Sequence, residues 1–132
     1  MVYRRQETTT KFVNFGKDKG LGNAIVIKEG KYLEGKIVGI KDSDTYKKIY
    51  DLNAKISKDK EEVVTILGTA ILNREMGYEF DEEGELKPLE ECQANYRVQV
   101  GDMVRIHFDG MIKTKRGKEA YDLWIEIDDG KK

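Results

Sequence analysis

The sequence predicts an all-β fold with one short helix, arranged as a five-stranded antiparallel barrel. The segment Val98–Ile127 alternates apolar and polar residues along two strands joined by a short turn, which is the pattern of a β-hairpin. Two glycines interrupt the apolar segment Lys31–Lys41, as in a strand that bends sharply to serve both halves of a small barrel. A long polar stretch before the hairpin leaves room for the helix.

Three strands are expected before that stretch. A further short strand candidate, Ala24–Lys28, precedes them, and a Glu-Gly turn connects it to the strand Lys31–Lys41. The next strand, Ile49–Ile56, alternates apolar and polar residues and is expected to be half-buried. A polar hairpin connection then leads into Val63–Leu72, the most continuous apolar strand.

The flanking and connecting segments have weaker patterns. Residues 1–23 lack a sustained period and are interpreted as an N-terminal extension, in which Phe12 and Phe15 are expected to pack onto the barrel. Asn73–Met76 begins a loop or a short helix, and Leu89–Tyr96 is a further candidate for a helical turn. Residues 129–132 are interpreted as a C-terminal tail.

Charge is divided unevenly along the chain. The net charge is −1, yet residues 1–60 carry +6 and residues 61–102 carry −8. Most of the acid lies in an insertion, residues 77–97, of which Tyr78–Glu91 holds seven carboxylates and the only proline. The rest of the chain is basic. We therefore expect the insertion to be exposed and to cover a basic groove until a polyanion arrives.

Five antiparallel strands with a long interruption between the third and the fourth are typical of the OB-fold barrel. An SH3-like barrel is the nearest alternative. The OB fold is preferred because it places its helix between the third and fourth strands, where residues 73–97 lie in this chain. The predicted OB-fold domain spans residues 24–128 and includes the acidic insertion.

A resemblance to a known family rests on Lys31–Asp42 (KYLEGKIVGIKD), Leu67–Asn73 (LGTAILN), and Val98–Gly110 followed by Thr114–Glu119 (TKRGKE). These segments resemble the single-stranded DNA-binding proteins of bacteriophages, which are small OB-fold proteins. The resemblance covers residues 24–128 and implies non-catalytic binding of single strands. Bacterial single-stranded DNA-binding proteins end in a flexible linker and an acidic tail tipped by Phe. Residues 128–132 (DDGKK) depart from that pattern, so neither tail-mediated recruitment nor a bacterial-type tetramer is expected.

Composition argues against several classes of protein. Cys92 is the only cysteine and His107 the only histidine, so neither a disulfide nor a Cys/His metal site is expected. The chain lacks a nucleophile elbow and a phosphate-binding loop, so we expect no enzyme, cofactor or metal. No apolar run approaches the roughly 18 residues of a membrane span, and the first residues have no signal-peptide pattern. A cytoplasmic protein is expected, in the host cytoplasm if it is viral.

The candidate nucleic-acid contacts are cations and rings, because single-strand binders neutralise phosphates and stack bases. The turn of the predicted hairpin, residues 113–118, holds four cations around a glycine. Trp124 alternates with the core residues of the last strand and is therefore expected to face outward, where a base can stack on it. The full set of candidates is Tyr46, Lys47, Lys48, Lys55, Arg105, Lys113, Lys115, Arg116, Lys118 and Trp124.

These features predict a protein that binds single-stranded DNA without sequence preference and protects it in replication, recombination or repair. Two alternatives remain. One is binding of single-stranded RNA, because no residue identifies a contact to a 2′-hydroxyl. The other is an OB-fold adaptor whose insertion and N-terminal extension bind replication or phage-assembly proteins. The expected partners are single-stranded DNA and replication or recombination proteins. A homodimer is compatible with the sequence, and no membrane partner is expected.

Overall fold

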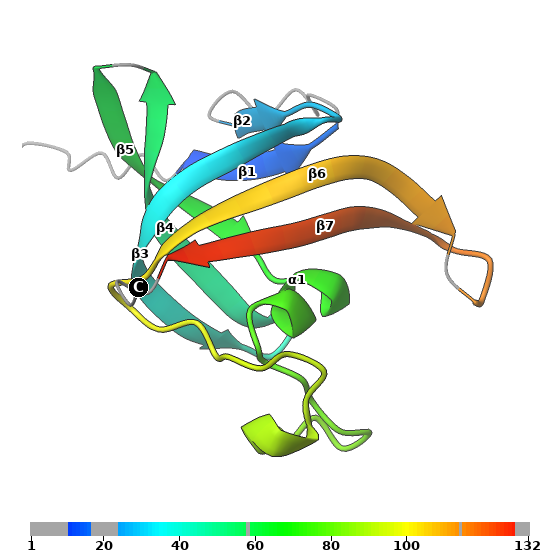
Figure 1. Cartoon of the computed structure of the whole chain (residues 1–132). Coiled ribbons are helices and arrows are strands. Elements are labelled where there is room, and N and C mark those ends of the chain that lie inside the picture. Colours follow the sequence, from blue (N-terminus) through cyan, green and yellow to red (C-terminus); the bar gives the residue numbers. More distant parts are fainter. Residues whose placement is uncertain (1–10, 17–23, 58, 114, 129–132) are drawn as a thin grey trace, which may run out of the picture.

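The computed structural model describes residues 11–16, 24–57, 59–113 and 115–128 (Figure 1). Its elements are β1 (Lys11–Phe15), β2 (Ala24–Ile27), β3 (Lys31–Ser43), β4 (Lys47–Ser57), β5 (Lys60–Leu67), α1 (Ala70–Glu75), a 3₁₀ turn (Leu89–Glu91), β6 (Met103–Lys113) and β7 (Glu119–Asp128). The prediction of a β-rich fold with one short helix is confirmed. The 3₁₀ turn occupies the start of the predicted helical segment 89–96. Thr114 and the predicted tail at residues 129–132 lie outside the described residues.

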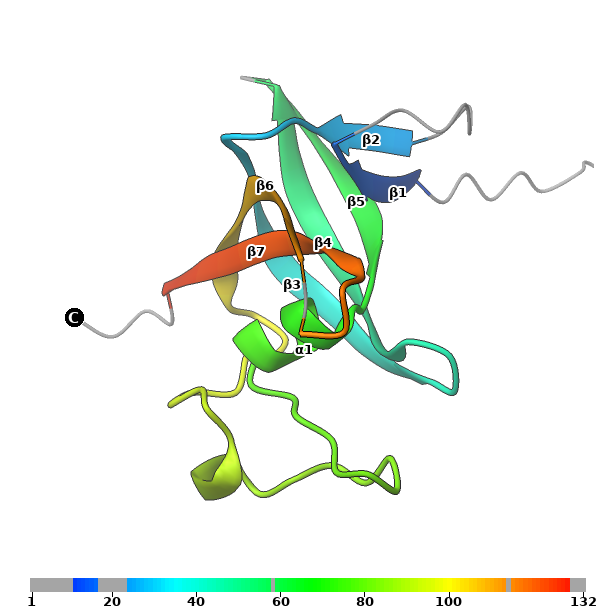
Figure 2. The same ribbon diagram turned by 90° about the vertical axis from the view of Figure 1, so that its right-hand side faces the viewer.

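The described strands belong to one curled, mixed sheet with the order β2-β1-β5-β4-β3-β6-β7. Between β5 and β7 every neighbouring pair in this order is antiparallel. Strand β1, in contrast, pairs parallel with both β2 and β5. The two perpendicular views show the sheet curling into an open half-barrel, with α1 below it (Figure 1 and Figure 2). Helix α1 packs against β7.

Strand β1 is a correction to the sequence prediction. The sequence predicts no strand in the N-terminal extension, residues 1–23, but residues 11–15 form a strand between β2 and β5. Val13 and Phe15 are buried and Phe12 is 40% exposed, so the segment alternates as a half-buried strand does. Packing of Phe15 onto the sheet is thus confirmed, and that of Phe12 is not. The edge of β5 pairs with β1. The five antiparallel strands of the predicted closed barrel are therefore not confirmed by the strand pairing.

The bend expected in the glycine-containing strand is present in β3. Gly35 lies so close to β4 that a Cβ atom on it would be 3.0 Å from Cα of Ala54. A register shift follows between Ile37 and Gly39, where the ladder to β4 has a bulge. Because of this bend, β3 pairs with β6 along its first half and with β4 along its second half.

The apolar run Val63–Leu72 is predicted as one strand, but its end is helical. Gly68 ends the strand, because its N–H donates to the carbonyl oxygen of Lys48 at 2.9 Å and a Cβ atom there would lie 2.2 Å from that oxygen. Thr69 then caps α1, since its Oγ1 accepts from the N–H of Leu72 at 3.1 Å. A continuous apolar run does not by itself distinguish a buried strand from a buried helix.

The acidic insertion, residues 77–97, is closed at its base by Arg97. The guanidinium of Arg97 donates to the carbonyl oxygens of Gly77 at 3.0 Å and Lys87 at 2.7 Å. It also lies over the buried ring of Tyr78, 5.4 Å from the ring centre. Figure 2 shows the insertion below α1, outside the curled sheet.

The core fills the inside of the curl. Its fully buried side chains include Ile37, Tyr50, Leu52, Ile66, Leu72 and Ile106. These residues come from β3, β4, β5, α1 and β6, so the helix closes one end of the same core. None of the helices in the described ranges is long and apolar enough to cross a membrane.

Candidate nucleic-acid interface

The hairpin tip between β6 and β7 presents four cations to solvent. The side chains of Lys113, Lys115, Arg116 and Lys118 are all exposed. Within the described part of the chain, none of the four forms an ion pair or a side-chain hydrogen bond. Gly117 allows the turn because its φ is +79°, a conformation that favours glycine. Figure 1 shows the tip at the end of an arm that β6 and β7 extend to one side of the molecule.

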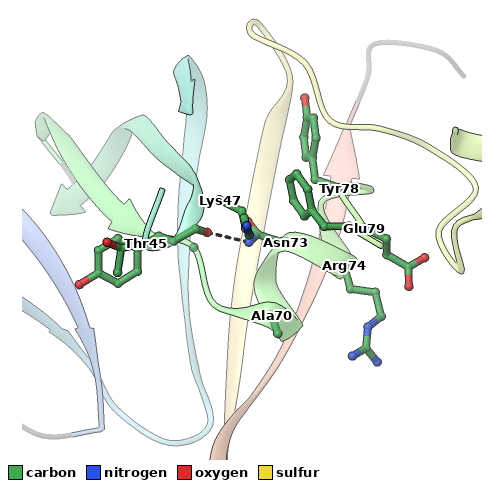
Figure 3. Close-up of a pocket in the computed structure, with 10 residues that line it drawn as sticks. Thr45, Lys47, Ala70, Asn73, Arg74, Tyr78 and Glu79 are labelled. Carbon is green, nitrogen blue, oxygen red and sulfur yellow. Dashed lines mark hydrogen bonds between the residues drawn. The ribbon is translucent and has the colours of Figure 1, made fainter. Parts of the chain in front are cut away.

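The β3–β4 turn carries Tyr46, Lys47 and Lys48. Lys47 has a φ of +66°, the one positive value at a non-glycine position in the described ranges. The turn is fixed to α1 by Asn73, whose Nδ2 donates to the carbonyl oxygen of Tyr46 at 2.9 Å (Figure 3). Asn73 Oδ1 accepts from the hydroxyl of Tyr50 at 2.8 Å. Burial raises the pKa of Tyr50 far above its ordinary value, so its phenol stays a donor.

A cavity of about 350 Å³ lies between this turn and α1. Tyr46 and Lys47 line it from the turn, Arg74 from α1, and Glu79 and Phe80 from the insertion. Lys47 Nζ lies 6.0 Å from the centre of the Phe80 ring. Figure 3 shows Arg74 extending outward from α1, and its side chain is exposed. Sequence reasoning missed Arg74 and Phe80, because neither belongs to a local cationic or aromatic cluster and only the fold places them beside Lys47.

The acidic insertion lies directly against the β3–β4 turn. Lys47 Nζ is 2.7 Å from the position that a Cβ atom on Gly84 would occupy. Lys48 Nζ lies 5.1 Å from the centre of the Tyr78 ring and pairs with Asp42, and the Lys48 side chain is 16% exposed. The insertion therefore contacts both lysines of the turn, and Lys47 remains exposed.

Lys55 and Arg105 lie on the outer face of the sheet and share one carboxylate, Glu34. Arg105 Nε donates to Glu34 Oε1 at 2.9 Å, and Lys55 Nζ lies 3.5 Å from Glu34 Oε2. The hydrogen bond from Arg105, together with the charge of Lys55, holds the pKa of Glu34 below its ordinary value against the opposing effect of burial. Part of the positive charge of both cations is thereby neutralised.

Trp124 is 40% exposed on the same outer face, in agreement with the alternation of its strand. Its Nε1 donates to Asp109 Oδ2 at 2.7 Å, and His107 covers one side of its ring. His107 Nε2 in turn lies 2.6 Å from Glu126 Oε1. Asp109 and Glu126 are the hydrogen-bond partners of these ring nitrogens, and their charges would also repel a polyanion.

The ten sequence candidates thus fall into three groups. The tip holds four of them, the β3–β4 turn holds three, and the outer face holds Lys55, Arg105 and Trp124. The cations of the outer face and Lys48 have carboxylate partners. The four tip cations, Lys47 and Arg74 are exposed and have no such partner in the ranges that the structure describes.

Comparisons of the chain with protein-family models, with curated proteins and with solved structures found no match. The interface is therefore interpreted from the geometry of its own residues.

Proposed function

We propose that this protein binds single-stranded DNA without sequence preference, with phosphates held between the β6–β7 tip and the β3–β4 turn. Its role in this proposal is to protect single strands during replication, recombination or repair, and no catalytic step is assigned to it. The observation that carries the proposal is the set of exposed cations at the tip that have no ion-pair partner among the described residues, Lys113, Lys115, Arg116 and Lys118. Such cations are free to replace the counterions of a phosphate backbone.

The strand order supports an OB-type barrel as the finer description of the fold. In that fold, oligonucleotides bind at the face of strands two and three and at the loops between strands one and two and between strands four and five. Strands β3 to β7 take the places of its five strands, and α1 lies between the third and the fourth. The β3–β4 turn and the β6–β7 tip then correspond to the two binding loops. The OB barrel can remain partly open, which accommodates β1 on the edge of β5.

The cavity beside the β3–β4 turn supplies the second requirement, rings near cations. Tyr46 is 38% exposed, and Phe80 lies beside Lys47 at the same cavity. Stacking on such rings contributes roughly 1–3 kcal/mol per base and tolerates any sequence. We assign base stacking to this cavity rather than to Trp124, whose ring is already stacked on His107 and hydrogen-bonded to Asp109.

Binding of dye-labelled oligonucleotides, measured by fluorescence anisotropy, tests the proposal. Oligothymidylate and oligodeoxyadenylate are expected to bind with similar affinity and a matched duplex much more weakly. The logarithm of the affinity is expected to fall by about 0.7 per neutralised phosphate for each tenfold rise in salt. Equal affinity for duplex and single strand, or no binding at low salt, would contradict the proposal. Tighter binding of oligouridylate would identify RNA as the ligand.

A further inference from the structure

A second cavity, of about 380 Å³, opens at the base of the β6–β7 arm, and β1 and the β2–β3 turn form its opposite side. Two backbone hydrogen bonds hold these segments together. The N–H of Gly16 donates to the carbonyl oxygen of Ile27 at 2.8 Å, and the N–H of Gly30 donates to that of Phe108 at 2.7 Å. None of the residues that line this cavity belongs to the proposed nucleic-acid interface.

Three aromatic rings line the cavity. The ring centre of Phe15 lies 5.6 Å from that of Phe108 and 5.8 Å from that of Tyr121, and Phe108 and Tyr121 are also 5.8 Å apart. Met111, which is 49% exposed, lines the cavity on the arm. Phe15 and Phe108 are 6% and 2% exposed and form the floor of the cavity, so the half-buried Tyr121 is the ring that can offer a face to a cation, and arginine uses such a face more often than lysine.

Two carboxylates, Glu29 and Glu119, complete the lining, and none of the lining residues that the structure describes is basic. Both are exposed, and neither has an ion-pair partner among the described residues. Glu29 lies directly over Gly110, since a Cβ atom on this glycine would be 2.1 Å from Glu29 Oε1. Gly110 has a φ of +110° in the bulge of β6, so the bulge both needs a glycine and leaves room for the carboxylate. The cavity is therefore anionic as well as aromatic.

We propose that this cavity binds an arginine side chain presented by a partner protein. A planar guanidinium can stack on the half-buried ring of Tyr121 while it donates two hydrogen bonds to Glu29 or Glu119. A lysine ammonium can use the same charges but has no planar face to stack. The carboxylates repel phosphate, so the cavity is distinct from the nucleic-acid interface, although Glu119 pairs with Lys113 of the tip across the β6–β7 ladder. The cavity adds a protein-binding surface to the proposed function.

The experiment is a titration of the ¹⁵N-labelled full chain with the capped peptide Gly-Arg-Gly, followed by NMR. Saturable shifts of the backbone amides of Gly16 and Gly110 are expected, because both glycines line the cavity. The same peptide with citrulline in place of arginine has the same shape and no charge, and it is expected to cause no saturable shift. A lysine peptide is expected to bind more weakly than the arginine peptide.

The variant Glu29→Gln/Glu119→Gln is expected to weaken binding of the arginine peptide by about tenfold or more, because both charge-assisted hydrogen bonds are lost. The single variant Glu119→Gln gives the same direction if the double variant does not fold. A control, Glu90→Gln/Glu91→Gln, removes the same charge from the insertion and is expected to leave binding unchanged. Unmoved Gly16 and Gly110 signals, equal binding of the citrulline peptide, or equal weakening in the control would each overturn the proposal.

Discussion

The indole of Trp124 stacks on the imidazole of His107, with ring centres 3.8 Å apart and ring planes 6° from parallel. The two residues face each other directly across the β6–β7 ladder. The indole nitrogen also donates to Asp109, so the ring is held on both its face and its edge. This pair is a cross-strand contact that stabilises the arm on which the cationic tip is carried.

The variant Trp124→Phe is expected to lower the free energy of unfolding by about 1 kcal/mol, because it loses the indole hydrogen bond and part of the stack. Its affinity for oligothymidylate is expected to fall by less than the roughly 1–3 kcal/mol that one stacked base contributes. Urea unfolding and anisotropy titration measure the two quantities. A large loss of affinity in a stably folded variant would place a base on Trp124 instead of at the β3–β4 turn.

Glu34 and Arg105 are expected to give a measurable dependence of stability on pH. The hydrogen bond from Arg105 holds the pKa of Glu34 below its ordinary value of 4.5. A carboxyl whose pKa is lowered by folding contributes stability that is present above 4.5 and is lost as the pH falls through the folded-state pKa. Replacing Arg105 with Gln should therefore make the decline in unfolding free energy between about pH 5 and pH 2 shallower. The same replacement made in a Glu34→Gln background should leave the decline unchanged, and a further change there would assign the effect to another carboxyl.

Lys47 is expected to lower the free energy of unfolding and to raise the affinity for single strands. Its positive φ costs roughly 1–2 kcal/mol for a residue with a side chain, and part of that is recovered by glycine. Lys47→Gly should therefore raise the free energy of unfolding by up to about 1 kcal/mol while it lowers affinity for single strands. The matched variant Lys47→Ala removes the same cation without relieving the backbone, so it should lower affinity equally and give no gain in stability. Unchanged affinity in both variants would exclude Lys47 from the site.

The acidic insertion is expected to compete with phosphate for the β3–β4 turn. Deleting residues 78–91 would remove the buried Tyr78, so neutralising charges is the cleaner change. Glu82→Gln/Glu83→Gln, in the turn beside Gly84, should raise affinity at low salt, with a smaller gain at high salt where charges are screened. Glu90→Gln/Glu91→Gln changes the net charge equally but lies in the 3₁₀ turn, and a smaller gain is expected from it. A loss of affinity in the first variant would mean that the insertion helps to form the site.

The fold was predictable from the sequence where a pattern repeats over several residues. Val104, Ile106 and Phe108 are buried on alternate positions of β6, as their spacing predicts. Strand β1 was not predictable, because five residues among glycines and polar residues do not reveal that the edge of β5 will bind them. The beginning of α1 was hidden inside a continuous apolar run, where the period is ambiguous.

The candidate site was predictable only in its local part. The tip cations are adjacent in the sequence, and they lie together at one turn. Ion pairs between residues far apart in the sequence cannot be predicted from such local clusters. Arg105 meets Glu34 across 71 positions of the chain, and that contact decides how much free charge Arg105 retains. Arg74 joins Lys47 at one cavity only because Asn73 fixes α1 to the β3–β4 turn.

The salt dependence of oligothymidylate binding by the variant Lys115→Ala/Arg116→Ala/Lys118→Ala tests the central claim most directly. Three lost phosphate contacts should lower the slope of log affinity against log salt by about 2 and weaken binding by about a hundredfold near 0.1 M salt. The melting temperature should stay nearly unchanged, because exposed turn residues contribute little to folding. The control Lys28→Ala/Lys31→Ala/Lys36→Ala removes the same charge from exposed positions at and near β3, and it should leave the slope close to that of the unaltered protein. A tip variant that binds with unchanged affinity and slope would contradict the account.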